Sequence, residues 1–208
     1  MPPSGLRADP GWDSLVVEVR RRSAGYDSTL RAELVTLAEQ DQRDRAGIEA
    51  VVTRFGRRSR EADSAFAMLD SADAPRVRRL EPLVDARGWP GISLVADDGA
   101  HAAWLIVQHA PAAVQRRLLS VVLAAARAGE ARASDAAYLE DRVLVADGKP
   151  RRYGTQIRWP AAREGTLVLE PTADEACVDR RRADVGLERS SRQRWSNGSA
   201  RIASARQG

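Results

Sequence analysis

Apolar residues recur at helical spacing along most of the chain, with polar and charged residues between them. The first long repeat predicts a helix over about 27–55, with Asp27 or Ser28 able to accept a hydrogen bond at its start. Residues 55–63, with the sequence FGRRSREAD, are predicted to be a polar connection. The apolar positions of this helix are Leu30, Leu34, Leu37, Ala38, Ile48, Val51 and Val52.

Further helices are predicted from the same periodicity. A stripe of Val and Leu indicates a helix over about 75–86, although Pro82 removes a backbone donor inside it and favours a kink or a later start. The sequence RGWPG at 87–91 then predicts a stop. Three more helices are expected, over 97–110, 112–128 and 134–147, the last of them capped by Ser134.

After Gly148 the pattern changes to alternating side chains. It predicts a β-hairpin with strands at about 152–159 and 165–170, followed by a short helix within 173–187. Because neighbouring helices with short links favour a bundle, the fold class we expect is mainly α, a helical bundle with a small C-terminal β-hairpin packed on it. The predicted organisation is an irregular N-terminus over 1–12, a single domain over 13–187 and a disordered, arginine-rich tail over 188–208.

The net charge of +4 is unevenly distributed along the chain. Residues 189–208 contain five arginines and no acid, so the preceding residues carry a charge near −1. Arginine almost entirely replaces lysine, which is typical of a bacterial genome of high GC content, and specific nucleic-acid binding is therefore unexpected. No apolar run is long enough for a membrane span and no export signal is visible, so we expect a cytoplasmic protein without a membrane partner. Cys177 is the single cysteine, which excludes an internal disulfide.

Two histidines, His101 and His109, are the only sources of imidazole. Their spacing of eight residues does not give the i, i+4 pair typical of zinc sites on helices, so no metal site is predicted. The sequence contains no phosphate-binding loop and no nucleophile elbow. For His109 alone, the simplest interpretation is a buried histidine at a helix C-terminus.

Several short motifs taken together resemble a known bacterial family. DQRDR (41–45), GWPG (88–91), AWLIVQHA (103–110), LEDRVLV (139–145) and YGTQ (153–156) occur in order, and VDRRRADVGL closes a similarity that spans roughly residues 30–187. The chain resembles the family catalogued as domain of unknown function 6624. The resemblance implies no reaction and no cofactor. It implies an acidic residue directly after QHA, where this chain has Pro111.

The polar residues at these motifs lead to a functional hypothesis. Buried polar groups are costly unless they bond to one another or to a ligand, so we predict a pocket centred on His109 that belongs to an enzyme or a small-molecule-binding protein. His109 would be a general acid or base, and Asp141 would orient it. The ligand-binding residues would be Gln108, Gln115, Arg142, Tyr153, Thr155 and Gln156. The alternative is a non-enzymatic helical module that binds another protein and whose polar network is structural. The cofactor, the small molecule and the partner stay open.

Overall fold

The computed structural model describes residues 11–14, 16–17, 25–158, 168–169 and 171–189, and the fold is mainly helical. The chain divides into two compact units. The first comprises Met1–Ala110 with Ala124–Ala131, and the second comprises Pro111–Leu123 with Arg132–Gly208. That residues 13–187 form a single domain stays a prediction. In the part of the chain that is described, no helix has both the length and the apolar character needed to cross a bilayer.

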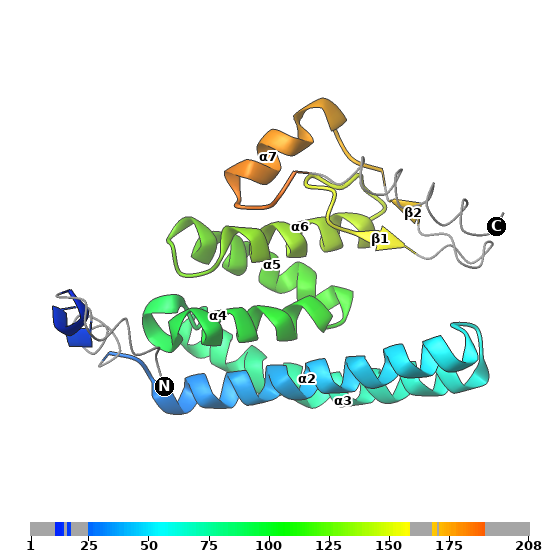
Figure 1. The fold of residues 1–208 in the computed structure, drawn as a ribbon, viewed down its shortest axis with the longest axis horizontal. Helices are drawn as coiled ribbons and strands as arrows, with labels where there is room; N and C mark the ends of the chain where they lie inside the picture. The colour runs from blue at the N-terminus through cyan, green and yellow to red at the C-terminus, as the bar shows by residue number, and fades with distance from the viewer. Residues whose placement is uncertain (1–10, 15, 18–24, 159–167, 170, 190–208) are drawn as a thin grey trace. The chain divides into compact units, whose positions relative to one another are not determined.

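The first unit is built on a long helical hairpin of α2 (Ser28–Phe55) and α3 (Arg60–Arg87), on which α4 (Ile92–His109) packs (Figure 1). The predicted bounds and cap of α2 are confirmed, because the Asp27 carboxylate accepts a hydrogen bond from the Leu30 amide at 2.9 Å. The interior of this unit consists of large apolar side chains on all three helices, among them Leu30, Leu34, Leu69, Leu80, Val84, Trp104 and Val107.

Helix α3 is much longer than the sequence predicted. It begins at Arg60, where the Ser59 hydroxyl caps it by accepting from the Ala62 amide at 3.1 Å, so the predicted polar connection is wrong beyond Ser59. The helix also continues through Pro75 and Pro82. Both prolines lie on the exposed side of α3, where water can satisfy the carbonyl groups that lose their intrahelical donors.

The GWPG turn and the start of α4 are held by Glu130, a residue of the same unit. Its carboxylate accepts from the Ser93 amide at 2.8 Å, and a Cβ on Gly91 would lie 2.3 Å from that carboxylate. Helix α4 begins earlier than predicted, but it is interrupted at Val95 and Ala96. Ala96 has φ 60° and ψ 173°, a conformation that strains any residue except glycine.

The second unit contains α6 (Ala133–Ala146) and α7 (Val178–Asp184), and helix α5 (Ala112–Arg127) contributes residues to both units. The helix predicted at 112–128 is confirmed, as is the short helix within 173–187, where the 3-10 turn η2 (Glu175–Cys177) precedes α7. Helix α6 also forms, but Ser134 does not cap it, because the N-cap position is Arg132.

The predicted hairpin is not established. Strands β1 (Ile157–Arg158) and β2 (Val168–Leu169) have two residues each and pair antiparallel, with Ile157 opposite Leu169. The segments 159–167 and 170 lie outside the described residues, as do residues 1–10 and 190–208, which include most of the two predicted irregular ends. The packing of a hairpin on the helices therefore stays a prediction.

Candidate functional site

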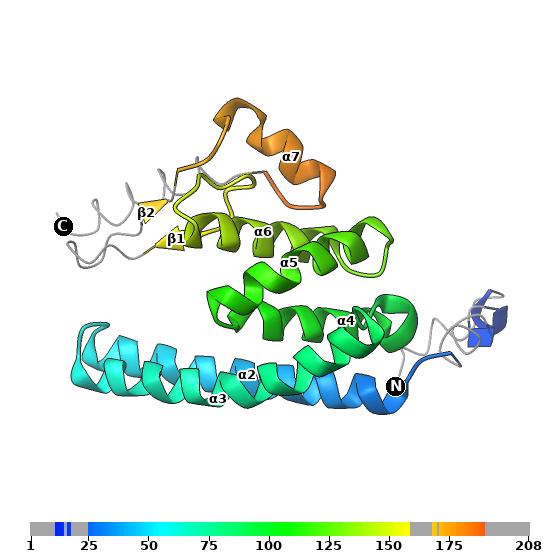
Figure 2. The same cartoon turned by 180° about the vertical axis from the view of Figure 1, so that it is seen from behind.

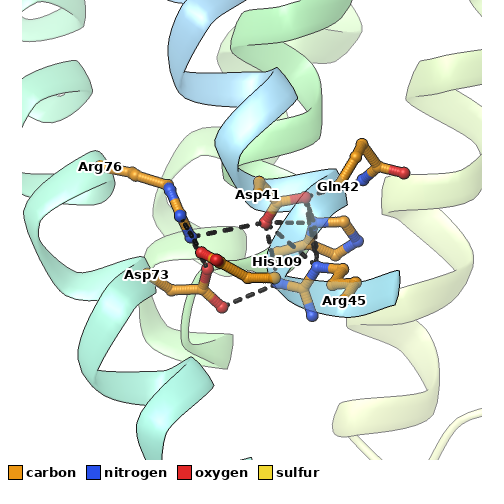
Figure 3. A network of polar contacts seen from close by, with 7 residues as sticks. Asp41, Gln42, Arg45, Asp73, Arg76 and His109 are labelled. Carbon is orange, nitrogen blue, oxygen red and sulfur yellow. Dashed lines mark hydrogen bonds and ion pairs between the residues drawn. The ribbon is translucent and has the colours of Figure 1, made fainter. Parts of the chain in front are cut away.

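His109 is the last residue of α4, and its imidazole contacts a carboxylate on α2. The Nδ1 atom lies 2.9 Å from Oδ2 and 3.0 Å from Oδ1 of Asp41 (Figure 3). Asp41 is 1% exposed, whereas the side chain of His109 is 16% exposed. A buried carboxylate therefore supports one edge of an imidazole ring that retains access to solvent.

Two arginines hold this carboxylate and a second one on α3. Arg45 lies one helical turn after Asp41, and its guanidinium contacts Asp41 at 3.0 Å and Asp73 at 2.8 Å. Arg76 contacts Asp73 at 2.8 Å and also pairs with Asp44. The ionisable residues of this cluster, which we call the Asp41 cluster, are Asp41, Asp44, Arg45, Asp73, Arg76 and His109. Figure 3 labels all of them except Asp44.

The contacts of Nδ1 bear on which nitrogen of the neutral His109 ring carries the proton. Arg45 Nε lies 2.9 Å from His109 Nδ1, but it also lies 3.1 and 3.2 Å from the two oxygens of Asp41. If Nδ1 accepted from Arg45, its lone pair would face the carboxylate oxygens of Asp41. If Nδ1–H donates to Asp41, Arg45 Nε–H still has an oxygen acceptor. The second arrangement satisfies every group, so we assign the proton of the neutral ring to Nδ1.

Asp41 is held in its ionised form. Burial by itself would raise the pKa of Asp41, but hydrogen bonds from His109 and Arg45 outweigh burial, and the pKa is far below the ordinary value for aspartate. The pKa of Arg76 is also shifted towards the charged form. Burial by itself would lower this pKa, but the hydrogen bonds to Asp44 and Asp73 outweigh burial and raise it. The cluster thus has three carboxylates against two guanidiniums, one net negative charge when His109 is neutral.

The second ring nitrogen of His109, Nε2, points away from the charged groups in Figure 3. No hydrogen bond to Nε2 is recorded within the described part of the chain. Gln42 lies on the exposed side of α2 and donates to Asp41 at 2.8 Å, so it also orients the carboxylate. An imidazole with Nδ1–H on a carboxylate and a lone pair on Nε2 can accept a proton or bind a hydrogen-bond donor.

A second polar cluster lies in the other unit, around Asp141 of α6. Asp141 is 0% exposed, and its carboxylate accepts from the backbone amides of Arg152, Tyr153 and Thr155 at 2.6, 3.0 and 2.8 Å. The Thr155 hydroxyl donates to the same carboxylate at 2.9 Å. The motif YGTQ is therefore a loop wound around one buried carboxylate, and Gly154 has the positive φ of 69° that this winding requires.

Arginines bind the carbonyl side of the same loop. Arg181 and Arg182 of α7 donate to the carbonyl oxygens of Arg152 and Tyr153, both at 2.8 Å. Arg151 donates to the carbonyl oxygen of Gln156. Asp141 thus binds three amides of this loop, and two arginines of the segment VDRRRADVGL bind two of its carbonyl groups.

The predicted site residues are divided between the units. Gln108 and His109 belong to the first, and Gln115, Asp141, Arg142, Tyr153, Thr155 and Gln156 belong to the second. Gln108 and Gln115 are buried. The structure brings Asp141 together with Tyr153 and Thr155, and Gln156 donates to Thr155 Oγ1 at 3.2 Å. A pocket that joins these residues to His109, with Asp141 as its orienting group, stays a prediction.

Sequence reasoning missed the charged partners of His109. Asp41 and Arg45 are the first and last residues of DQRDR, a motif that carried the family resemblance but was given no role. Their i, i+4 spacing places them on one face of α2, which was the available signal. The sequence signal for Asp73 and Arg76 was weaker, because no helix was predicted over residue 73 and their spacing therefore did not place them on one helix face. Among the described residues, no group of three or more His, Cys, Asp or Glu side chains could hold a metal ion.

Comparison with known proteins gives one match. The model of a family described as a family of unknown function (DUF6624) matches residues 27–193. This range includes the Asp41 cluster and the loop around Asp141. No curated protein and no solved structure matches the chain significantly.

Proposed function

The chain belongs to the DUF6624 family, and from the geometry of His109 we propose that it is an enzyme or small-molecule-binding protein in which His109 Nε2 is the acting group. The single observation that carries the proposal is the contact of 2.9 Å between His109 Nδ1 and the buried carboxylate of Asp41. A proton on Nδ1 that is donated to Asp41 would hold the ring in this orientation and would leave the lone pair on Nε2.

The proposed chemistry is general base and then general acid catalysis. Nε2 would take a proton from a hydroxyl, water or amine of the bound molecule and return it to the departing group. The positive charge that develops on the ring would be balanced by the cluster, whose net charge would pass from −1 to zero. Asp41 would stay ionised throughout, as a carboxylate that orients an imidazole usually does.

The roles of Gln108, Gln115, Arg142, Tyr153, Thr155 and Gln156 as ligand contacts, and of Asp141 as a further orienting group, belong to this proposal. The chemistry of the residues supports them, since amides, hydroxyls and a guanidinium can position a polar ligand. Asp141 already accepts four hydrogen bonds, which favours a role in shaping the loop that presents Tyr153 and Thr155.

The matched substitutions are His109→Asn and His101→Ala. The side-chain amide of asparagine can still donate to Asp41 from the position of Nδ1, but it has no counterpart of Nε2. His101 stacks on Trp104 with ring centroids 5.0 Å apart and has no part in the Asp41 cluster. Native mass spectrometry of the purified protein should show a bound species in the wild type and in His101→Ala that is absent in His109→Asn. Retention of that species in His109→Asn, or its absence from the wild type, would contradict the proposal.

A structural role for the cluster is the second candidate. It is favoured by the burial of Asp41, Asp73 and Arg76, which connect α2 with α3. Reaction with diethyl pyrocarbonate, read by peptide mass, separates the two candidates without a known substrate. A general base predicts faster acylation of His109 than of His101 and a slower rate in Asp41→Asn. A purely structural cluster predicts that Asp41→Asn leaves the His109 rate equal or higher, because a loosened ring is more accessible.

A further inference from the structure

The turn between α2 and α3 carries an unusual concentration of arginine. Arg54, Arg57, Arg58 and Arg60 are all exposed, and we call these four residues the Arg tip. In Figures 1 and 2 this turn forms the end of the helical hairpin and extends beyond the end of α4, the third helix of the same unit. Helix α4 therefore does not cover the turn, and its arginines are exposed.

The arginines of the tip lack the acidic partners that many other arginines of the described residues have. Ion pairs with Asp or Glu are recorded for nine arginines elsewhere, namely Arg31, Arg43, Arg45, Arg76, Arg79, Arg87, Arg116, Arg152 and Arg181. Within the same described ranges, none is recorded for any arginine of the tip. Two acids follow in the first turn of α3, Glu61 and Asp63, so residues 54–63 carry a net charge of +2.

Two aromatic rings lie among these arginines. The guanidinium carbon of Arg54 is 5.1 Å from the centroid of the Phe55 ring, and that of Arg57 is 4.9 Å from the centroid of the Phe66 ring. Phe55 is 47% exposed, although it is a large apolar residue. The turn itself is fixed by short hydrogen bonds, since the Ser59 hydroxyl donates to the Gly56 carbonyl at 2.8 Å. The tip thus presents cations and an exposed ring from a defined backbone.

We propose that the Arg tip docks on the surface of an anionic lipid bilayer. Guanidinium groups bind phosphate oxygens, and an aromatic ring at the same level can enter the boundary between headgroups and acyl chains. Docking on the surface of a bilayer requires no transmembrane helix, and none is found among the described residues. The proposal does depart from the expectation of a protein without a membrane partner.

A single-stranded nucleic acid is the competing partner of the same charge, and the geometry favours it less. Proteins that bind single strands stack bases on open aromatic faces along a groove. Here one face of each ring is already occupied by a guanidinium, and the arginines lie at the end of a hairpin.

The test is sedimentation of the full chain with vesicles. Vesicles of phosphatidylglycerol and phosphatidylcholine in equal parts are compared with vesicles of phosphatidylcholine alone. The tip variant is Arg57→Gln/Arg58→Gln. The matched control is Arg78→Gln/Arg180→Gln, which removes the same charge from two exposed arginines of α3 and α7 that have no recorded ion pair in the described ranges. Both variants keep the arginine-rich segment 189–208, so binding through that segment would be equal in the two.

We expect the wild type and the control to bind the anionic vesicles and not the neutral ones. Each arginine near an anionic surface contributes roughly fivefold in partition, so the tip variant, which lacks two of them, should bind about 25-fold more weakly. Phe55→Ser should also weaken binding while leaving every charge in place. The proposal is overturned if the wild type does not sediment, if the tip variant and the control behave alike, or if the tip is needed for an oligonucleotide and not for vesicles. None of these outcomes depends on His109, so the proposed function stands or falls separately.

Discussion

Asp141→Asn tests whether one buried carboxylate organises the YGTQ loop. The substitution keeps the shape of the side chain but replaces one acceptor oxygen by an amide group. The Oδ1 atom accepts from the amides of Arg152 and Tyr153, and Oδ2 accepts from the amide and the hydroxyl of Thr155. Whichever way the asparagine side chain turns, its NH₂ group faces at least one backbone N–H that has lost its acceptor.

The expected cost follows from these contacts. A buried donor left without an acceptor costs about 1–3 kcal/mol, and the hydrogen bonds that remain lose the strengthening that a charged acceptor gives, about 1 kcal/mol each. Together these terms predict that Asp141→Asn lowers the free energy of unfolding by about 3–5 kcal/mol. Because small domains have only about 5–15 kcal/mol of stability, the variant should be severely weakened.

Urea unfolding followed by circular dichroism measures this loss, and Asp147→Asn is the matched control. Asp147 follows the same helix and pairs with Arg116 at 2.6 Å, but it is an exposed residue, so the control should lose much less stability than Asp141→Asn. Hydrogen exchange should show lost protection at residues 152, 153 and 155 in Asp141→Asn. A loss of stability below about 1 kcal/mol, with those amides still protected, would refute the reasoning.

Three further predictions concern the first unit. Asp41→Asn should lower the free energy of unfolding at neutral pH, measured by urea unfolding. Because folding lowers the pKa of Asp41, the difference in unfolding free energy between variant and wild type should become smaller as the pH falls below about 4. Ala96→Gly should raise the free energy of unfolding by about 1 kcal/mol, since glycine tolerates φ 60° and ψ 173°; a loss would argue against this backbone conformation. Gly91→Ala should lower it by about 2 kcal/mol through the clash with Glu130, whereas Gly47→Ala, with nothing within 4 Å of the added carbon, should not; equal thermal shifts would count against the clash.

Local signals at helix ends account for part of what the sequence predicted correctly. Helix α2 has Asp27 as its cap and Gly56 as its stop, and α5 ends before Gly129, which has φ 75°. Helix α3 was predicted at less than half its length because Pro75 suits the first turn of a helix and Pro82 opposes a helix interior, so these local signals placed the start too late. Packing against α2 and α4 outweighs those signals, and both prolines are tolerated on the exposed side.

The candidate site was only partly predictable for a related reason. His109 and Asp141 were identified as polar residues of the motifs that carry the family resemblance, and Asp141 is buried with four donors around it. The carboxylate that contacts His109 is Asp41, which lies 68 residues earlier in the chain. A contact over that separation depends on how α2 and α4 pack, and one sequence does not specify the pairing.

The central claim is that Asp41 fixes the tautomer of His109 and leaves the lone pair on Nε2. The most direct measurement is the long-range ¹H–¹⁵N correlation spectrum of the imidazole groups, with His101→Ala used to assign the two histidines. For neutral His109 we predict a protonated, pyrrole-type Nδ1 and an unprotonated, pyridine-type Nε2, a pattern that Asp41→Asn should weaken. A protonated Nε2 with an unprotonated Nδ1 would mean that Nδ1 accepts from Arg45, and it would contradict the proposed role of His109.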